Sequence, residues 1–234
     1  MKLSNQIAIV TGGGRGIGRQ TAIDLAQEGC KVMIASRSES ELQETVAVIR
    51  EFGGEADRFV GDLTRQENAQ GLMKATLERF GPPTILINNA GVLRVTPFEE
   101  ITMEEWDSVM DVNLRSVFIL SQLALKEMMK HRRGYIINIS STAALDVSSA
   151  HASYGASKAG VGGLTQSLRK AASPYGIKVS AVYPGMTETQ MVKEFHEKNE
   201  ESSWLLPQDI SDCIMFLLRT SERCLIKDLI PVNR

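Results

Sequence analysis

The chain lacks the residue pairs that build disulfide frameworks and metal sites. Its 234 residues include only three cysteines, Cys30, Cys213 and Cys224, which are widely separated and form no C-x-x-C pair. An odd, scattered set of this kind is typical of reduced packing residues in a cytosolic protein. The three histidines are also scattered and do not have the spacing of metal ligands. We therefore expect a reduced protein without a metal site.

The sequence also lacks a membrane-spanning run, a signal peptide and a strong net charge. It begins Met1-Lys2-Leu3 and passes almost directly into a strand-like run, and no long apolar segment follows. The formal net charge is −2, which implies no overall attraction to nucleic acid or to an anionic membrane. We interpret the local basic run at residues 130–133 as a solvated helix end. These absences predict a cytoplasmic protein without nucleic-acid or membrane partners.

Short β-branched apolar runs alternate with longer segments of helical period. The expected strands are Ile7–Thr11, Lys31–Ala35, Asp57–Val60, Thr84–Asn88, Tyr135–Ser140, Lys178–Tyr183 and Ile226–Val232. The expected helices are Gly16–Glu28, Ser40–Phe52, Arg65–Phe80, Glu104–Lys130, Ala152–Ser173 and Pro207–Thr220. This alternation predicts an α/β fold in a single domain over residues 1–234, a doubly wound Rossmann-type parallel sheet of about seven strands with helices on both faces. Ligands of such sheets bind at the carboxyl ends of the strands.

A glycine-rich turn, T-G-G-G-R-G-I-G, connects the first expected strand to the first expected helix. Gly12 allows a tight turn, Gly16 allows the backbone to approach a pyrophosphate, and Gly18 allows the helix to pack close to the sheet. The N-terminus of the helix then offers free N–H groups and a positive dipole end to phosphates. Although a glycine turn alone is weak evidence, its place between a strand and a helix favours a dinucleotide site.

Tyr154 and Lys158 are one helical turn apart in Y-G-A-S-K, so they share a helix face. A nearby ammonium group is expected to lower the pKa of the phenol, which would let Tyr154 act as a general acid or base. Ser141 and its neighbour Ser140 end the preceding strand, and strand alternation lets only one of them face a site there. Asn113 lies inside a long helical segment, where asparagine is disfavoured.

In this order, the glycine turn, Asn113, Ser141, Tyr154 and Lys158 resemble the short-chain dehydrogenase/reductase family, in its single-domain, 3-oxoacyl-thioester-reductase-like branch. The resemblance covers nearly all of residues 1–190 and is weaker beyond. It implies hydride transfer between nicotinamide and a carbonyl or alcohol carbon. It also implies that Ser141, rather than Ser140, polarises the substrate oxygen, that Lys158 holds ribose hydroxyls, and that Asn113 perturbs its helix and holds a water beside Lys158.

The end of the second strand predicts which nicotinamide cofactor is used. NAD-binding proteins place a carboxylate there for the ribose 2′-hydroxyl, but this chain has Ser36 and Arg37. Arg37 suits a 2′-phosphate, and Arg15 in the glycine turn could hold the same group. The sequence therefore predicts NADP(H), with an NAD-preferring alcohol dehydrogenase as the alternative. Both arginines could instead be exposed solubilising residues.

The resemblance implies further cofactor contacts along the carboxyl edge. Asp62 would contact adenine, although a turn aspartate gives the same pattern. Residues 89–91 would lie beside the adenosine ribose, and Thr187 and Thr189 would bind the carboxamide, although threonines there could also cap a helix. The complete expected set is Gly12, Gly14, Arg15, Gly16, Ile17, Gly18, Ser36, Arg37, Asp62, Leu63, Asn89, Ala90, Gly91, Tyr154, Lys158, Pro184, Gly185, Thr187 and Thr189.

The sequence leaves the substrate open beyond a small carbonyl or alcohol. Residues 186–206 mix apolar and charged side chains and form either a mobile substrate lid or an ordinary surface helix. Helices at 104–130 and 152–173 are apolar on more than one face, which predicts a homodimer or homotetramer. The chain ends without the glycine-rich tail that is frequent in the family. The sequence therefore does not decide whether the second interface of a tetramer forms. A non-catalytic NADP(H)-binding redox sensor is the rival from another class, whereas an epimerase or a methyltransferase fits the motifs less well.

Overall fold

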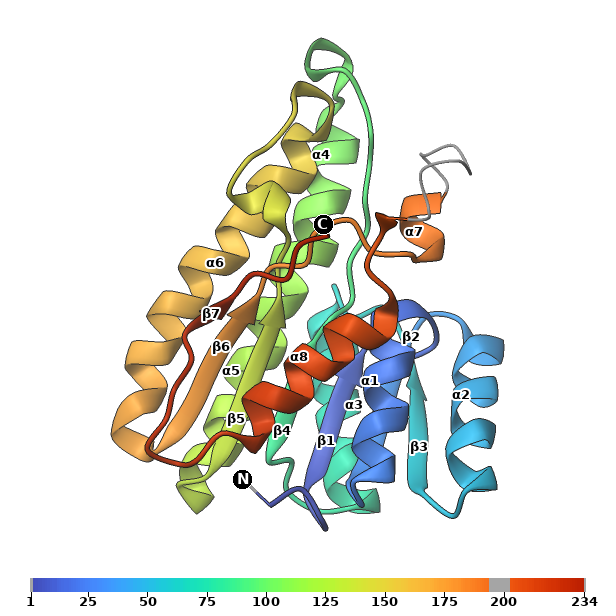
Figure 1. Cartoon of the computed structure of the whole chain (residues 1–234), viewed down its shortest axis with the longest axis vertical. Coiled ribbons are helices and arrows are strands. Elements are labelled where there is room, and N and C mark those ends of the chain that lie inside the picture. The colour runs from blue at the N-terminus through green and yellow to red at the C-terminus, as the bar shows by residue number, and fades with distance from the viewer. Residues whose placement is uncertain (1, 194–202, 234) are drawn as a thin grey trace.

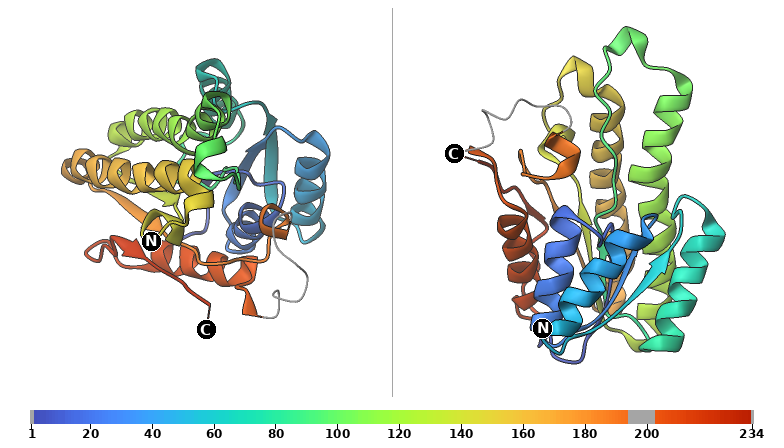
Figure 2. Two further views of the ribbon diagram at one scale, coloured as in Figure 1. Left: turned by 90° about the horizontal axis from the view of Figure 1, so that it is seen from above. Right: turned by 90° about the vertical axis from the view of Figure 1, so that its right-hand side faces the viewer.

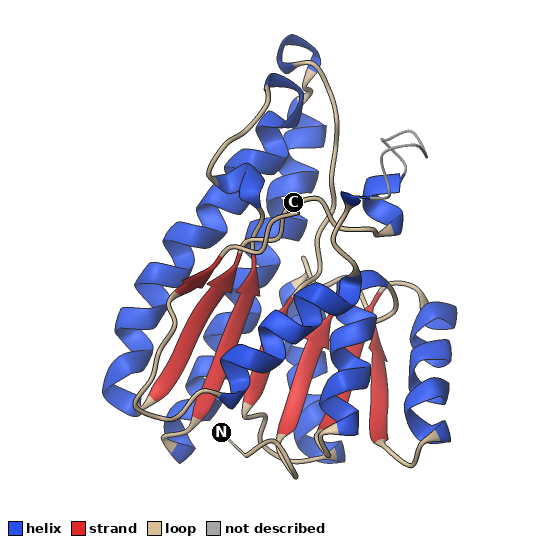
Figure 3. Cartoon of the chain, viewed as in Figure 1, coloured by secondary structure: helices blue, strands red, loops and turns tan. Residues whose placement is uncertain are grey.

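The computed structural model describes residues 2–193 and 203–233, and its centre is one parallel sheet (Figure 3). The strands lie in the order β3-β2-β1-β4-β5-β6-β7, and each pairs with its neighbours in parallel. Their bounds are β1 (Ile7–Thr11), β2 (Lys31–Ser36), β3 (Glu55–Val60), β4 (Ile85–Asn88), β5 (Gly134–Ile139), β6 (Ile177–Val182) and β7 (Asp228–Leu229). The doubly wound fold predicted from the sequence is confirmed.

The sheet lies between two layers of helices, one on each face (Figures 1 and 2). The bounds are α1 (Gly16–Gln27), α2 (Glu39–Glu51), α3 (Gln66–Arg79), α4 (Met103–Met110), α5 (Ser116–His131), α6 (Ala152–Ala172), α7 (Gln190–Lys193) and α8 (Pro207–Arg219). Helices α1, α2 and α8 pack on one face, and α3, α5 and α6 pack on the other. No helix in the described ranges is both long and apolar enough to cross a bilayer.

Alternating side chains of each strand enter two separate cores. In β1, Ala8 and Val10 face the core shared with α1, α2 and α8, whereas Ile9 faces the opposite core. Because both faces are covered, the central strands are continuously apolar instead of alternating with polar residues. The chain order reverses between β1 and β4, and in sheets of this kind the crevice at such a reversal is the usual ligand site.

The helix expected over Glu104–Lys130 is not continuous, which corrects the sequence prediction. Helix α4 ends at Met110, a π-helical turn occupies Asp111–Arg115, and α5 begins at Ser116. The π-helical turn contains Asn113, whose side chain is buried and bonded outside the helix. Helix propensity identified only an unfavourable residue, whereas the family resemblance implied that Asn113 perturbs its helix, as the π-helical turn shows.

The last strand is much shorter than the expected Ile226–Val232. Only Asp228 and Leu229 pair with β6 as a strand. The chain still follows β6 further, because Tyr183 N–H donates to the Leu229 carbonyl and Gly185 N–H donates to the Pro231 carbonyl. Pro231 has no N–H of its own, so regular pairing ends near it. The C-terminal segment therefore lies along the strand end that leads into the site.

Candidate active site

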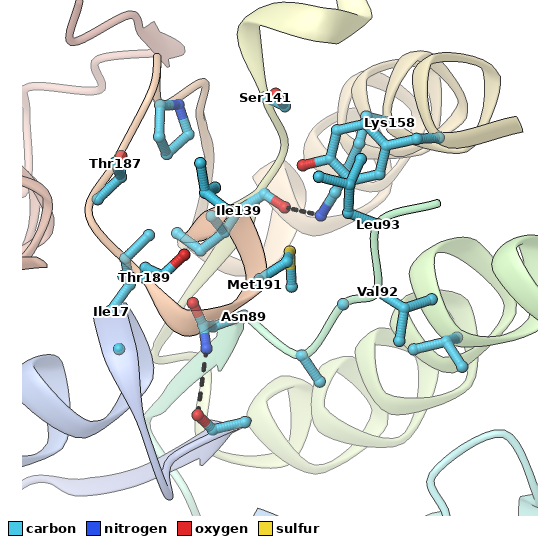
Figure 4. Close-up of a pocket in the computed structure, with 18 of the residues that line it drawn as sticks. Ile17, Asn89, Val92, Leu93, Ile139, Ser141, Lys158, Thr187, Thr189 and Met191 are labelled. Carbon is cyan, nitrogen blue, oxygen red and sulfur yellow. Dashed lines mark hydrogen bonds between the residues drawn. The ribbon is translucent and has the colours of Figure 1, made fainter. Parts of the chain in front are cut away.

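One cavity of about 570 Å³ opens along the carboxyl edge of the sheet, where β1, β2, β4, β5 and β6 end. Nearly every cofactor or catalytic residue expected from the sequence lines it, from the glycine turn to Thr189. The exceptions are Gly18 and Asn113, which lie behind its wall. Figure 4 shows Lys158, Ser141 and Leu93 at one side of this cavity, with Ile17 and Asn89 at another. Residues distant in the sequence thus meet at one edge of the sheet.

The glycine turn forms a backbone cradle at the start of α1. Gly12 and Gly16 have φ values of +65° and +54°, in the left-handed region that favours glycine. A Cβ on Gly18 would collide with the carbonyl oxygen of Gly12, so this glycine allows the helix to approach the turn closely. The N-terminus of α1 has no side-chain cap and no acidic residue in its first turn. Its N–H groups therefore remain available to an anion in the cavity.

Thr11 and Asn89 hold this cradle against the end of β4. The Thr11 hydroxyl accepts hydrogen bonds from the backbone N–H groups of Asn89 and Ala90, at 3.0 and 2.9 Å. The Asn89 side-chain amide donates to the Thr11 carbonyl at 3.0 Å and lies 3.4 Å from the Gly12 carbonyl oxygen. Asn89 therefore helps to fix the shape of the glycine turn through its side chain.

The end of the cavity beside β2 carries several charges. Arg37 is exposed and forms no hydrogen bond or ion pair with the described residues, but its charge acts on Asp62. Arg15 Nη1 donates to Gln190 Oε1 at 2.8 Å and lies 3.5 Å from Glu41 Oε1. Sequence reasoning missed Glu41, which lines the cavity, whereas Gln190 belongs to the expected 186–206 segment. Glu41 could have been found from its place in the first turn of the helix after Arg37.

Asp62 is held in a tight turn after β3. Its Oδ1 accepts hydrogen bonds from the Thr64 hydroxyl at 2.8 Å and from the Thr64 N–H at 3.1 Å. Burial raises the pKa of Asp62, but the Thr64 hydrogen bonds and the charges of Arg37 and Arg65 outweigh it, so the pKa is lowered. The carboxylate lines the cavity and also shapes its own turn, as expected of a turn aspartate.

Ser140 and Ser141 point in different directions at the end of β5. The Ser140 hydroxyl is buried and donates to the Lys158 carbonyl at 2.9 Å, which ties β5 to α6. The Ser141 hydroxyl accepts from the Ala143 N–H at 3.1 Å and also interacts with the Tyr154 phenol. Ser141 therefore lies on the cavity wall with Tyr154, whereas the Ser140 hydroxyl forms a structural hydrogen bond between β5 and α6.

The pKa of the Tyr154 phenol is raised, which corrects the expectation that Lys158 lowers it. Burial raises this pKa, and the hydrogen bond with Ser141 lowers it only in part. The Lys158 Nζ lies 5.8 Å from the centroid of the tyrosine ring, and its hydrogen bond goes to the Ile139 carbonyl rather than to the phenol. The spacing of one helical turn places both side chains at the cavity, but the Lys158 ammonium group and the Tyr154 hydroxyl are not in contact. The phenol consequently keeps its proton at neutral pH.

Lys158 is a buried cation without a carboxylate partner among the described residues. It is 4% exposed, and its Nζ donates to the Ile139 carbonyl at 2.9 Å (Figure 4). Burial lowers its pKa from 10.5 to about 8. A Cβ on Gly91 would lie 3.4 Å from Nζ and 3.2 Å from the Asn113 Oδ1, so the glycine lets the β4 loop pass close to both groups.

Asn113 is completely buried and acts on the site through its neighbours. Its Oδ1 accepts from the Val92 N–H at 2.8 Å, and its Nδ2 donates to the Val92 carbonyl at 2.9 Å and to the Ser157 hydroxyl at 3.0 Å. Ser157 in turn donates to the Tyr154 carbonyl at 2.6 Å. Ser157, which sequence reasoning also missed despite its place in the Y-G-A-S-K motif, therefore links Asn113 to the start of α6.

The segment after β6 closes one side of the cavity. The Thr187 hydroxyl donates to the Gly185 carbonyl at 2.9 Å, and Thr187 pairs with Leu205 in a short parallel bridge. Thr189 faces the glycine turn, because a Cβ on Gly16 would lie 3.2 Å from its methyl group. Part of the expected lid, residues 194–202, lies outside the described residues. The described residues contain no cluster of three or more His, Cys, Asp or Glu side chains able to hold a metal.

Comparison with known proteins agrees with this geometry. A family model described as short chain dehydrogenase matches residues 6–200. An uncharacterized oxidoreductase of Thermotoga maritima is 40% identical over 190 residues, which are 81% of this chain and 75% of the relative. A 3-oxoacyl-(acyl-carrier-protein) reductase of the same organism is 32% identical over 225 residues, 93% of this chain and 92% of the relative.

Solved structures with the same architecture also align over nearly the whole chain. A variant of actinorhodin polyketide ketoreductase with NADPH has a TM-score of 0.91 at 30% identity, with 99% of this chain and 97% of that chain covered. A dehydrogenase/reductase from Sinorhizobium meliloti has a TM-score of 0.90 at 31% identity, with 99% and 96% covered.

Proposed function

Since the chain belongs to the short-chain dehydrogenase family, we propose that it is an NADP(H)-dependent reductase of a small carbonyl compound, with Tyr154 as the general acid. One observation carries the proposal. Tyr154, Ser141 and the buried Lys158 line the same cavity as the glycine turn. A proton donor, a hydroxyl for the substrate oxygen and a cation therefore surround one space next to a phosphate cradle.

The residues fit a nicotinamide dinucleotide. The uncapped N-terminus of α1 and the turn from Gly12 to Gly16 would hold the pyrophosphate. Asp62 and Leu63 would border adenine, and residues 89–91 the adjacent ribose. Pro184, Gly185, Thr187 and Thr189 would border the nicotinamide end. When bound, the cofactor supplies the hydride, and the protein supplies position and electrostatics.

The raised pKa of Tyr154 favours the reductive direction. A phenol that keeps its proton at neutral pH can donate it to the oxygen of a carbonyl as that carbon is reduced. The Ser141 hydroxyl, on the same wall, can donate a hydrogen bond to this oxygen as negative charge develops. Alcohol oxidation would need Tyr154 to start as the phenolate, so that it can accept the proton, and burial opposes the formation of this anion.

Lys158 and Asn113 would assist this chemistry without contacting the substrate oxygen. A cationic Lys158 can donate to the hydroxyls of a ribose that enters the cavity. Asn113 is a positioning residue, because its amide holds Val92 on one side and Ser157 on the other. A water between Asn113 and Lys158 that returns protons to the phenol is part of the proposal.

Two arginines support NADP(H) as the cofactor. Arg15 and Arg37 line the cavity beside Ser36, where no carboxylate stands at the end of β2 to receive a ribose 2′-hydroxyl. The structural relative with NADPH agrees with this choice. The substrate class we favour is a 3-oxoacyl thioester or a related ketone, since the aligned relatives include a 3-oxoacyl reductase and a polyketide ketoreductase.

We further propose that the chain works as a single domain over 1–234 in a cytoplasmic homodimer or homotetramer. The apolar side chains Phe118 on α5 and Phe216 on α8 are about half exposed in the single chain, which is consistent with burial on another subunit. The described parts of the expected lid, residues 186–193 and 203–206, would border the substrate, with α7 among them.

The direct test is an absorbance assay of nicotinamide oxidation with a carbonyl panel that includes 3-oxoacyl thioesters and small ketones. NADPH and NADH are compared at equal concentration. The proposal predicts turnover with at least one ketone and a higher kcat/KM for NADPH than for NADH. Better use of NADH would contradict the cofactor assignment, and absence of turnover with both cofactors across the panel would contradict the reductase.

A further inference from the structure

The adenosine end of the cavity carries a carboxylate that the proposed function does not use. Glu41, in the first turn of α2, lines this end together with Arg15 and Arg37. We propose that Glu41 is a selectivity residue that opposes a cofactor 2′-phosphate, so that the preference for NADPH over NADH is smaller than the two arginines alone would give. This inference rests on the proposed function and names a further determinant of its cofactor preference.

The backbone of Glu41 is fixed against the glycine turn. The Thr45 hydroxyl donates to the Glu41 carbonyl at 3.0 Å and to the Gly14 carbonyl at 3.3 Å, so it joins α2 to the turn. A Cβ placed on Gly14 would lie 2.8 Å from the Glu41 Cβ and 3.2 Å from its Oε2. The carboxylate therefore lies beside Gly14 of the glycine turn.

Arg15 is already shared between two partners. Its Nη1 lies 3.5 Å from Glu41 Oε1 and donates to Gln190 Oε1 at 2.8 Å. A 2′-phosphate within reach of Arg15 would consequently lie close to the Glu41 carboxylate. Two anions at such a distance repel each other, and the repulsion is stronger at a partly desolvated cavity wall than in bulk water. Glu41 thus offsets part of the attraction that Arg15 provides.

The Arg15–Glu41 pair contributes little to folding. Its side chains are 53% and 33% exposed, and ion pairs of this kind stabilise a protein by about 0–1 kcal/mol. Removing the charge from Glu41 should therefore leave the fold intact while changing the potential at the cavity. The effect of Glu41 is predicted to appear in ligand affinity rather than in stability.

The same helix turn supplies a matched control. Glu39 is also in the first turn of α2, but its carboxylate accepts from Gln43 at 2.9 Å and pairs with Arg58 at 3.4 Å. It does not line the cavity. Glu39→Gln removes the same charge from the same turn without touching Arg15, so it measures the effect of net charge alone.

The experiment is a calorimetric titration of the full chain with NADPH and with NADH, for the wild type, Glu41→Gln and Glu39→Gln. We expect Glu41→Gln to raise the ratio of NADPH to NADH affinity about tenfold, and Glu39→Gln to change it less than about twofold. The gain should shrink in high salt, because added ions screen the repulsion. Glu41→Ala, with circular dichroism to verify folding, repeats the test with a shorter side chain.

Three outcomes would decide against the inference. If the wild type binds NADPH and both Glu41 variants leave the affinity ratio unchanged, the inference about Glu41 is overturned and the proposed function stands. A lower ratio would also overturn it, because Glu41 would then position Arg15 for the phosphate. Failure of the wild type to bind either dinucleotide would overturn the proposed function itself, and this result is distinguishable because it precedes any comparison of variants.

Discussion

The two ends of the cavity are built differently. At the end beside β2, Arg15 and Glu41 form a long, partly exposed ion pair, and Arg37 is exposed. At the end beside α6, Lys158 is 4% exposed and Asn113 is fully buried, and each has a hydrogen-bond partner within 3.0 Å. Exposed charges are screened and adapt at low energetic cost, whereas a buried polar group must keep its partners.

Substitutions at the two ends of the cavity should therefore have different effects. Changes at the exposed end should alter ligand affinity by modest factors and depend on salt. Changes at the buried end should alter catalysis strongly, or alter stability when the group only supports the fold. The following predictions test this contrast in order of decreasing effect.

Ser141→Ala and Ser140→Ala form the sharpest pair. We expect Ser141→Ala to lower kcat about a hundredfold or more, because the substrate oxygen loses its hydrogen-bond donor. Ser140→Ala removes a buried bond to the Lys158 carbonyl, so its main effect should be a loss of about 1 kcal/mol in the free energy of unfolding. Steady-state kinetics and urea unfolding of both variants measure the contrast. Equal losses of kcat would contradict the assignment of the two hydroxyls.

The buried lysine predicts a pH dependence. Because burial lowers the pKa of Lys158 to about 8, the free protein loses this cation as the pH rises above that value. The kcat/KM for NADPH reports groups of the free enzyme, so it should fall about tenfold per pH unit well above pH 8. The raised pKa of Tyr154 keeps the phenol from titrating in the same range.

Unfolding does not explain such a fall in activity. The unfolded chain keeps the lysine proton up to about the ordinary pKa of 10.5, whereas the folded chain releases it near 8. The contribution of Lys158 to stability therefore rises between these values, and its burial cost is fully present below pH 8. A kcat/KM that stays level to pH 10, measured alongside thermal unfolding, would contradict a role for the cationic lysine.

Arg37→Ala should have the smallest effect of the three. We expect NADPH to bind about tenfold more weakly and NADH to change less than about twofold, because only the former carries the 2′-phosphate. The difference should diminish in high salt. An equal loss of affinity for NADPH and NADH would show that Arg37 supports the fold of the site and does not bind the 2′-phosphate.

Much of this architecture could be predicted from the sequence, for identifiable reasons. Apolar strands covered on both faces have a strong pattern, and β1 begins and ends where expected. Strand alternation reduced the choice at the end of β5 to one serine, and family spacing selected Ser141. The motif in α6 gave the correct helix face for Tyr154 and Lys158.

The remaining features depend on contacts that sequence spacing does not contain. The break at Asn113 follows from its bonds to Val92 and Ser157, which lie far away in the chain. The pKa of Tyr154 follows from burial, whereas helical spacing indicated only a nearby lysine. The place of Glu41 in the helix after Arg37 was a signal, but its contact with the glycine turn depends on Thr45, which joins two separate elements.

The most direct test of the account is Tyr154→Phe, which removes one hydroxyl from the cavity wall. NADPH titration and steady-state turnover of the same preparation should separate binding from chemistry. The account predicts NADPH affinity within about threefold of wild type and a turnover lower by about a thousandfold, because the proton donor is lost. Turnover within about tenfold of wild type would contradict Tyr154 as the general acid.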